Sequence, residues 1–168
     1  MIKHSLKIDQ LSLVVFDFDG VFTDNHLYVS QNGTESIRCY RGDGLGLARL
    51  KSLGIEIVVI STEVNPVVSV RAEKLGVPCI QGCEDKLEVL KTYATELGVD
   101  LSQVAFVGND INDRSCLKSV NLPVVVADAA EEILPLAEIV LKKKGGEGAV
   151  REICDMVWNV RKELGEVG

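Results

Sequence analysis

The 168-residue sequence predicts an α/β fold built on a Rossmann-like, doubly wound parallel sheet. Short apolar runs that suit strands alternate with amphipathic segments that suit helices over the whole length. The first run, residues 13–16, is apolar without alternation, which is typical of a central strand covered on both faces. We therefore expect a single domain over residues 1–168.

The expected elements follow one another in a regular order. A hairpin over about 25–40 has Asn32-Gly33 in its turn, and the next helix begins at Asp43 and ends at Gly54. After a strand at 55–60, Asn65-Pro66 starts a helix, because Asn caps well and Pro suits the first helical position. The remaining elements are a strand at 78–81, a helix from 86 to 97, strands at 104–107 and 124–126, a helix at 131–137, a strand at 138–141 and a helix from 148 to about 164.

Composition narrows the class of protein. The chain is 46% hydrophobic, which is enough for a sizeable core at this length. No apolar run reaches the length of a membrane span and the first nine residues are too polar for a secretory signal, so we expect a cytoplasmic protein without membrane contact. The net charge of −7 disfavours a nucleic-acid partner. The five scattered cysteines lack a paired zinc-ligand spacing and are expected to be reduced thiols.

Polar side chains recur at the carboxyl ends of the predicted strands, where an open α/β sheet binds its ligands. Asp17 and Asp19 directly follow the first strand, and their spacing puts both on one side. Two carboxylates this close repel each other unless a cation is shared between them, and oxygen ligands suit Mg²⁺. Further polar groups follow the later strands or open the next helix: Ser61, Thr62, Lys86, Asn109, Asp110 and Asp113.

Together these groups predict a phosphoryl-transfer site. The carboxylate of Asp17 can attack phosphorus, while Asp19 can protonate the leaving oxygen and later activate water. The Ser61 hydroxyl, the Lys86 ammonium and Mg²⁺ would neutralise the charge of the phosphoryl group. Each group alone has an ordinary alternative as a turn, a helix cap or a solvated charge, and only their common placement favours function.

The stretch Asp17–Asp24 resembles the first motif of the haloacid dehalogenase superfamily, in the form used by 3-deoxy-D-manno-octulosonate 8-phosphate phosphatases. The resemblance covers essentially the whole chain and extends to sialic-acid and ketodeoxynononate 9-phosphate phosphatases and to the C-terminal domains of some acylneuraminate cytidylyltransferases. It implies a haloacid dehalogenase-like fold with a β-hairpin insertion and no cap domain. Its further matching segments are 41–46, 81–82, 85–86, 108–113, 123–129 and 145–152.

The resemblance also implies roles for the polar groups. Asp17 matches the nucleophile and a magnesium ligand, and Asp19 matches the acid/base whose backbone carbonyl binds the metal. Ser61 and Lys86 match the phosphate-binding pair. Asn109 stands where the family usually has a metal-binding aspartate. The metal shell then loses one negative charge, and we expect a higher magnesium requirement unless Asp110 or Asp113 compensates.

Residues around the substrate are likewise implied by the resemblance. Glu63, Arg71 and Lys74 fall near positions that these enzymes use for substrate, and Arg71 suits a sugar-acid carboxylate because it can bind it bidentately. Arg151 is expected to reach the substrate of a neighbouring subunit. The hairpin at 25–40 matches the segment through which the relatives form homotetramers and close each other's active sites.

We therefore expect a magnesium-dependent phosphatase that acts through an aspartyl-phosphate on a phosphorylated 3-deoxy-2-ulosonic sugar acid. Octulosonate 8-phosphate, of lipopolysaccharide synthesis, and a nonulosonate 9-phosphate, of sialic-acid synthesis, both remain open. The alternative is a catalytically weak oligomerisation module, for which Asn109 is the only support. A phosphotransfer receiver would share the acidic strand ends, but it gives no reason for Asp-x-Asp followed by Gly-Val-Phe-Thr.

Overall fold

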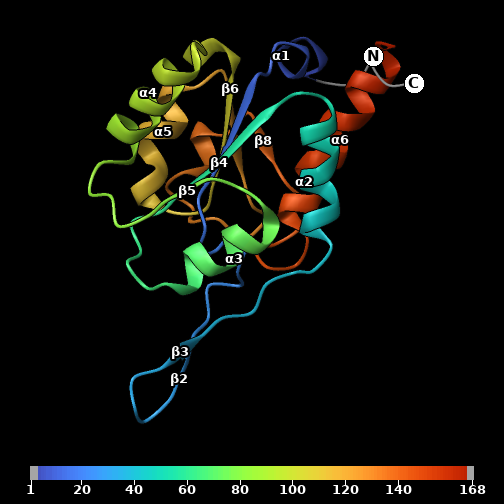
Figure 1. The fold of residues 1–168 in the computed structure, drawn as a ribbon. Helices are drawn as coiled ribbons and strands as arrows, with labels where there is room; N and C mark the ends of the chain where they lie inside the picture. Colours follow the sequence, from blue (N-terminus) through green and yellow to red (C-terminus); the bar gives the residue numbers. More distant parts are fainter. Residues whose placement is uncertain (1–3, 166–168) are drawn as a thin grey trace.

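A six-stranded parallel sheet forms the centre of the molecule in the computed structural model, which describes residues 4–165 (Figure 1). The strand order is β5-β4-β1-β6-β7-β8, and each neighbouring pair runs parallel. The prediction of a parallel α/β sheet is therefore confirmed. The strands are β1 (Leu13–Phe16), β4 (Glu56–Ile60), β5 (Cys79–Ile80), β6 (Val104–Gly108), β7 (Leu122–Val125) and β8 (Ile139–Val140).

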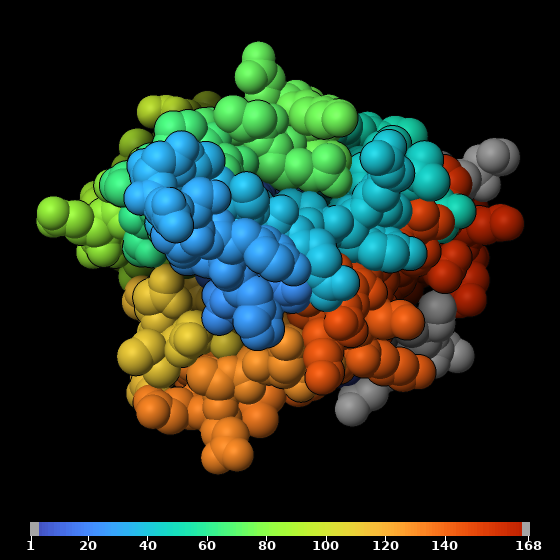
Figure 2. All heavy atoms as spheres, turned by 90° about the horizontal axis from the view of Figure 1, so that it is seen from below, coloured from blue at the N-terminus to red at the C-terminus, as the bar shows by residue number. Residues whose placement is uncertain are grey.

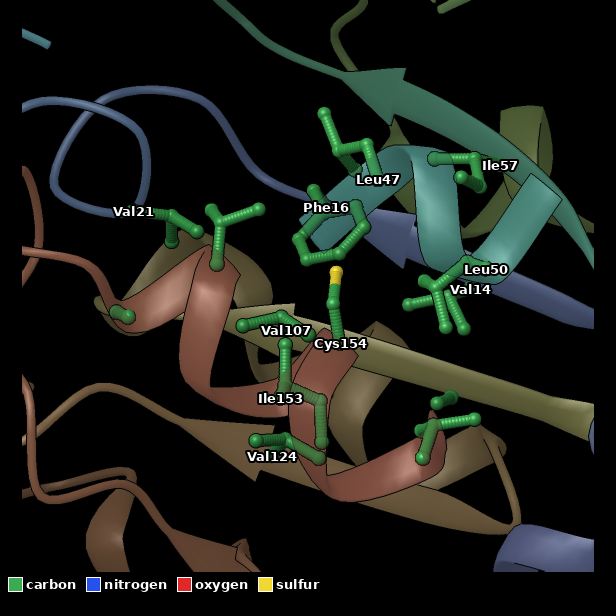
Figure 3. Packing of buried hydrophobic residues seen from close by; sticks show 14 of the residues in the cluster. Val14, Phe16, Val21, Leu47, Leu50, Ile57, Val107, Val124, Ile153 and Cys154 are labelled. Atoms are coloured by element: carbon green, nitrogen blue, oxygen red, sulfur yellow. The ribbon is translucent and has the colours of Figure 1, made fainter. Parts of the chain in front are cut away.

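Helices cover both faces of this sheet, with α4 and α5 on one side and α2 and α6 on the other (Figure 1). Successive side chains of β1 point to opposite faces, so Val14 and Phe16 join one buried cluster while Leu13 and Val15 join the other. In Figure 3, Val14 and Phe16 lie among residues of α2 and α6 such as Leu50. The helices are α1 (Ser5–Asp9), α2 (Asp43–Ser52), α3 (Val67–Leu75), α4 (Lys86–Leu97), α5 (Arg114–Ser119) and α6 (Ala149–Glu163).

Three short 3₁₀ helices also form in the described chain: η1 (Leu101–Gln103), η2 (Ile111–Asp113) and η3 (Leu134–Leu136). The helix predicted over 131–137 is wrong, since only η3 forms there. Pro135 lies within that short segment and has no N–H to extend an α-helical ladder. All five cysteines are free. None of the described helices is both long and apolar enough to cross a lipid bilayer.

The predicted hairpin projects from the body of the molecule between β1 and α2 (Figure 1). Its strands, β2 (Tyr28–Val29) and β3 (Glu35–Ser36), are antiparallel, and Gly33 takes the positive φ of 81° that its turn requires. Leu27, Tyr28 and Val29 are 54%, 65% and 66% exposed. In the described chain, this hairpin is the only secondary structure between β1 and α2. A cap domain inserted at this point is therefore absent from the described residues, and the exposed apolar side chains of the hairpin lie there instead.

Candidate active site

The loops that follow β1 and β6 meet at one edge of the sheet, because these two strands are direct neighbours. The backbone N–H of Asp17 donates to the carbonyl of Val107 at 2.9 Å, which continues the strand pairing into the site. Asp17 is buried and Asp19 is half-buried. Both line a cleft of about 300 Å³ together with Asn25, Asn109, Asp110, Ile111 and Asn112.

A buried ion network lies beneath this cleft. Lys86 Nζ is 2.7 Å from Asp17 Oδ1 and 2.8 Å from Asp113 Oδ1, and all three side chains are almost fully buried. Burial lowers the pKa of Lys86, but the two carboxylates outweigh it and raise the pKa above its usual value, so the ammonium stays charged. Lys86 can therefore supply positive charge beside Asp17, the candidate nucleophile.

Asp113 holds this lysine in place. Its other oxygen, Oδ2, accepts the backbone N–H groups of Asn109 at 2.9 Å and Asp110 at 3.3 Å. Both oxygens are thus engaged in fixing Lys86 and the turn after β6. The sequence places Asp113 in the same polar group but does not predict that it binds Lys86, because only the fold brings α4 against this turn.

Burial also shifts the pKa values of the two candidate catalytic carboxylates. Burial raises the pKa of Asp17 to about 7, the charge of Asp113 adds to this, and Lys86 opposes it. The pKa of Asp19 is raised by burial and then by the negative charge of Glu63, while a hydrogen bond with Thr23 lowers it. A raised pKa suits Asp19 as a group that must carry a proton before it can donate one.

The residues at the cleft fit a magnesium ion. One terminal atom of the Asn109 amide lies 3.0 Å from Asp17 Oδ2 and 3.0 Å from the Asp19 carbonyl oxygen. With its nitrogen there, the amide donates to both; with its oxygen there, three oxygens converge as a hard cation requires. Among the described residues, no three His, Cys, Asp or Glu side chains gather in a metal-binding arrangement. Any such shell must therefore use the amide and the carbonyl.

Asp110 lies at the rim of the same cleft, with one oxygen engaged in local structure. Its Oδ1 accepts the backbone N–H of Ile111 at 2.7 Å and caps η2. Ser61 follows β4, which pairs with β1 on the side opposite to β6. It is buried, and its Oγ accepts the backbone N–H of Glu63 at 3.1 Å, so the hydroxyl still has its own proton to donate.

The residues predicted around the substrate lie in separate hollows. Arg71 and Lys74 line a groove of about 560 Å³ between the hairpin and α3. Glu63 lines a smaller pocket of about 170 Å³ with Asp19. Glu35 of the hairpin borders both, so the two hollows adjoin. Figure 2 shows the hairpin, in light blue, lying across this face beside the green region that includes α3.

Arg151 does not line the cleft of its own chain. It borders a different groove of about 490 Å³, where its Nε donates to both oxygens of Asp155 at 2.8 Å. Tyr40 and Gly148 also line this groove. Within one chain, Arg151 is therefore not brought together with Asp17 and Asp19.

Comparisons with known proteins identify the family of the chain. A family model described as haloacid dehalogenase-like hydrolase matches residues 80–153. The 3-deoxy-D-manno-octulosonate 8-phosphate phosphatase of Escherichia coli K12 is 33% identical over 161 residues, which cover 95% of this chain and 86% of that protein.

Solved structures are similar over nearly the whole fold. The 3-deoxy-D-manno-octulosonate 8-phosphate phosphatase from Moraxella catarrhalis, in complex with a magnesium ion, a phosphate ion and a KDO molecule, is 31% identical with a TM-score of 0.92, over 98% of this chain and 95% of that one. A HAD family hydrolase from Streptomyces avermitilis is 40% identical with a TM-score of 0.86, over 90% and 86% of the two chains. The chain therefore belongs to the haloacid dehalogenase-like phosphatases, in the branch that contains the 3-deoxy-D-manno-octulosonate 8-phosphate phosphatases.

Proposed function

We propose that this chain is a magnesium-dependent phosphatase that hydrolyses the phosphate ester of a 3-deoxy-2-ulosonic sugar acid, with octulosonate 8-phosphate as the first candidate. The convergence of Asp17, Asp19 and Asn109 above the buried Lys86 carries this proposal. The relatives from Escherichia coli and Moraxella catarrhalis are phosphatases of octulosonate 8-phosphate, which supports this substrate. A nonulosonate or sialic acid 9-phosphate belongs to the same chemical class. Either substrate would place the enzyme in the cytoplasm, in lipopolysaccharide or sialic-acid synthesis.

The reaction divides between the two aspartates. Asp17 attacks phosphorus, so that a carboxylate oxygen–phosphorus bond forms as the ester oxygen–phosphorus bond breaks. Asp19 gives its proton to the departing alcohol oxygen, and then takes a proton from the water that attacks the aspartyl-phosphate and releases Asp17. The raised pKa of Asp19 supports this order of proton transfers.

The surrounding groups stabilise the charge that is transferred. Lys86 and the Ser61 hydroxyl would bind the phosphoryl oxygens, with Asp113 keeping the lysine in position. Asp17, the Asp19 carbonyl and Asn109 would hold Mg²⁺, with Asp110 at the rim of the same cleft. When bound, Mg²⁺ supplies positive charge that offsets the charge of the phosphoryl group.

The sugar acid would extend from the cleft toward the hairpin and α3. Arg71 and Lys74 provide positive charge in the large groove, and the guanidinium of Arg71 suits the carboxylate of the sugar acid. Glu63 lies in the pocket next to Asp19 and can accept hydrogen bonds from sugar hydroxyls. This direction supports a substrate with phosphate at one end and carboxylate at the other.

A homotetramer would close these open hollows. The exposed apolar residues of β2 and the preceding Leu27 support burial of the hairpin in a subunit contact. Arg151 would then approach the active site of a neighbouring subunit from its own groove. Closure by a neighbour would exclude water without a cap domain.

The test is phosphate release, with and without Mg²⁺, from octulosonate 8-phosphate and from ketodeoxynononate and N-acetylneuraminate 9-phosphates. We expect Mg²⁺-dependent turnover that Asp17→Asn lowers on the order of a thousandfold or more, because the amide cannot act as the nucleophile. Thermal unfolding of the variant serves as the control for folding.

The outcomes separate the candidates. The substrate with the highest kcat/KM identifies the sugar acid. Turnover that survives Asp17→Asn would contradict the aspartyl-phosphate. Absence of turnover on all three esters at high Mg²⁺ would favour the oligomerisation module, which the neutral Asn109 in the metal shell supports.

A further inference from the structure

A carboxylate that the proposed reaction does not use is buried behind the large groove. Asp43 opens α2 and is fully buried. Its Oδ1 accepts the backbone N–H of Arg151 at 3.1 Å. Its Oδ2 is buried and has no hydrogen-bond partner in the described part of the chain. A half-satisfied buried carboxylate is costly, so a compensating interaction is needed.

Close packing of α2 against α6 keeps Asp43 from water. A Cβ atom added at Gly46 would lie 3.0 Å from Arg151 Cδ and 3.0 Å from Cys154 Cβ, so the absence of a side chain there lets the helices approach. The first turn of α2 consequently meets the first turn of α6, at the hydrogen bond between Asp43 and Arg151. Neither helix can reorient without disturbing this carboxylate.

Asp43 and Arg71 meet at the carbonyl of Tyr40, which accepts the backbone N–H of Asp43 at 3.4 Å and a terminal nitrogen of Arg71 at 3.5 Å. Arg71 of α3 and Arg151 of α6 both favour its charged form. Cys154 of α6 and Cys39, just before α2, both feel its negative charge, which together with burial raises the pKa of each thiol. Asp43 therefore lies within electrostatic reach of Arg71, the residue proposed to bind the sugar-acid carboxylate.

Arg71 is held by few hydrogen bonds on its buried side. Its Nε is buried and has no hydrogen-bond partner among the described residues, and one terminal nitrogen makes only a long contact of 3.5 Å to the carbonyl of Tyr40. Arg71 nevertheless lines the groove together with Lys74 and Arg41. Lys74 and Arg41 carry the same charge as Arg71 and repel its guanidinium. A negative charge on the buried side of Arg71 would hold the guanidinium at the groove wall.

We propose that Asp43 is a positioning residue, whose buried negative charge holds the guanidinium of Arg71 at the groove wall in the orientation that binds the substrate carboxylate. The proposal rests on the function proposed above for Arg71. It assigns specificity for an anionic sugar to an electrostatic pair, of which only one member reaches the substrate.

Asp43 should act in a pH-dependent way. Burial raises the pKa of Asp43 to about 7, although the N–H of Arg151 and the charges of Arg71 and Arg151 lower it. The positioning charge is thus present above about pH 7 and is lost as the pH falls below it. Binding of the sugar-acid carboxylate should weaken in the same direction.

The first experiment uses Asp43→Asn, which keeps the size of the side chain and an oxygen for the N–H of Arg151. At about pH 8 we expect KM for the sugar-acid phosphate to rise about fivefold or more. kcat, and the KM for p-nitrophenyl phosphate, which has no carboxylate, should not change. At about pH 6 the difference from wild type should shrink, because wild-type Asp43 is then largely protonated. Equal losses on both esters would overturn the proposal, since they would show a structural role.

The second experiment is a double-mutant cycle with Arg71→Ala. If Asp43 acts through Arg71, the double variant should have the KM of Arg71→Ala alone; free energies that simply add would overturn the proposal. If Arg71→Ala leaves KM for the sugar-acid phosphate unchanged, the proposed substrate site itself is wrong. If Arg71→Ala raises KM for the sugar-acid phosphate and Asp43→Asn does not, only the role proposed for Asp43 is wrong.

A third measurement keeps the test open even if Asp43→Asn fails to fold. In wild type, the ratio of KM for the sugar-acid phosphate to KM for p-nitrophenyl phosphate should rise more steeply than in Arg71→Ala as the pH falls through about 7. The two phosphate esters titrate at different pH values, and Arg71→Ala shows that difference without the effect of Asp43. The same pH dependence of the ratio in wild type and in Arg71→Ala would overturn the proposal.

Discussion

Asn109 sets the charge of the proposed metal shell. Its amide lies 3.0 Å from both Asp17 Oδ2 and the Asp19 carbonyl, so in the proposed shell it would supply a neutral ligand. A magnesium site made of one carboxylate, one carbonyl and one amide attracts the ion less than a site with two carboxylates. The chain therefore keeps the ion network of Asp17, Lys86 and Asp113, while its proposed metal site should bind Mg²⁺ more weakly than a site with two carboxylates.

Replacing Asn109 by Asp should lower the Mg²⁺ concentration for half-maximal activity, by about tenfold, because the shell gains a negative charge. A magnesium titration of phosphate release measures this. Without metal, the same variant should melt at a lower temperature than wild type, because its new carboxylate faces that of Asp17. Asn112→Asp is the matched control, since Asn112 is exposed at the rim of the same cleft. Equal magnesium responses of the two variants would argue against Asn109 as a ligand.

At the level of single residues, the sequence indicates the groups that follow strands and misses those that act through other side chains. Asp17, Asp19 and Lys86 could be predicted, because strand ends and acidic spacing are visible in the chain. Asp113 contacts Lys86, and Asp43 accepts the N–H of Arg151, across helix packing that no local pattern specifies. Their burial is a property of the assembled fold.

Among the elements, the loop before α6 supports the turn that carries Asp19. Gly146 donates its N–H to the Val21 carbonyl at 3.2 Å, and a Cβ at Gly145 would lie only 1.9 Å from the Gly20 carbonyl oxygen. The loop and the turn therefore approach each other closely through backbone atoms. A side chain at Gly145 would have to push the two apart.

Gly145→Ala should destabilise the protein by more than about 2 kcal/mol and also lower kcat, because the displaced turn positions Asp19. Gly33→Ala is the comparison: it has open space around its Cβ but a φ of 81°, so we expect a loss of about 1 kcal/mol from backbone strain and no change in kcat. Urea unfolding and steady-state kinetics give both quantities. Similar losses in the two variants would show that the close backbone contact is unimportant.

Elements with strong local signals were the ones that could be predicted. The hairpin follows from Asn32-Gly33. The Asn65-Pro66 start of α3 is displaced by one residue: Pro66 is the N-cap and the helix begins at Val67, whose N–H donates to Asn65 Oδ1 at 3.1 Å. The segment 131–137 has helical apolar spacing, but it contains Pro135, and only the short η3 forms there. The short helices α1 and α5 were not predicted, because so few residues give no detectable periodicity.

For the molecule as a whole, the exposed hairpin is the feature that most needs a partner. An isolated two-stranded ribbon is marginally stable in water, and this one exposes Tyr28 and Val29. The order of strands and the grooves beside the hairpin depend on tertiary packing, so the sequence could predict a parallel sheet but not which hollows adjoin. Only the assembled molecule brings the pocket of Glu63 next to the groove of Arg71.

Polar substitution of the hairpin should dissociate the proposed tetramer. We expect Tyr28→Ser with Val29→Ser to shift the species in solution from tetramer to smaller forms and to reduce kcat/KM by about tenfold or more, since the cleft loses its cover. Light scattering coupled to gel filtration measures the mass. Leu6→Ser is the control, because Leu6 is 76% exposed on α1, away from the hairpin. A wild-type enzyme that is fully active as a monomer would contradict this prediction.

The position of β1 between β4 and β6 also determines at which stage of synthesis the ion network around Asp17 can form. Asp17 is made early, yet its two lateral strands and its ion partners Lys86 and Asp113 follow much later in the chain. A buried ion network is stable only when all its members are present. On the ribosome, the nascent chain therefore carries Asp17 without its ion partners until β6 and the turn with Asp113 have emerged. The ion network can form from that point, before β7, β8 and α6 are made and complete the core.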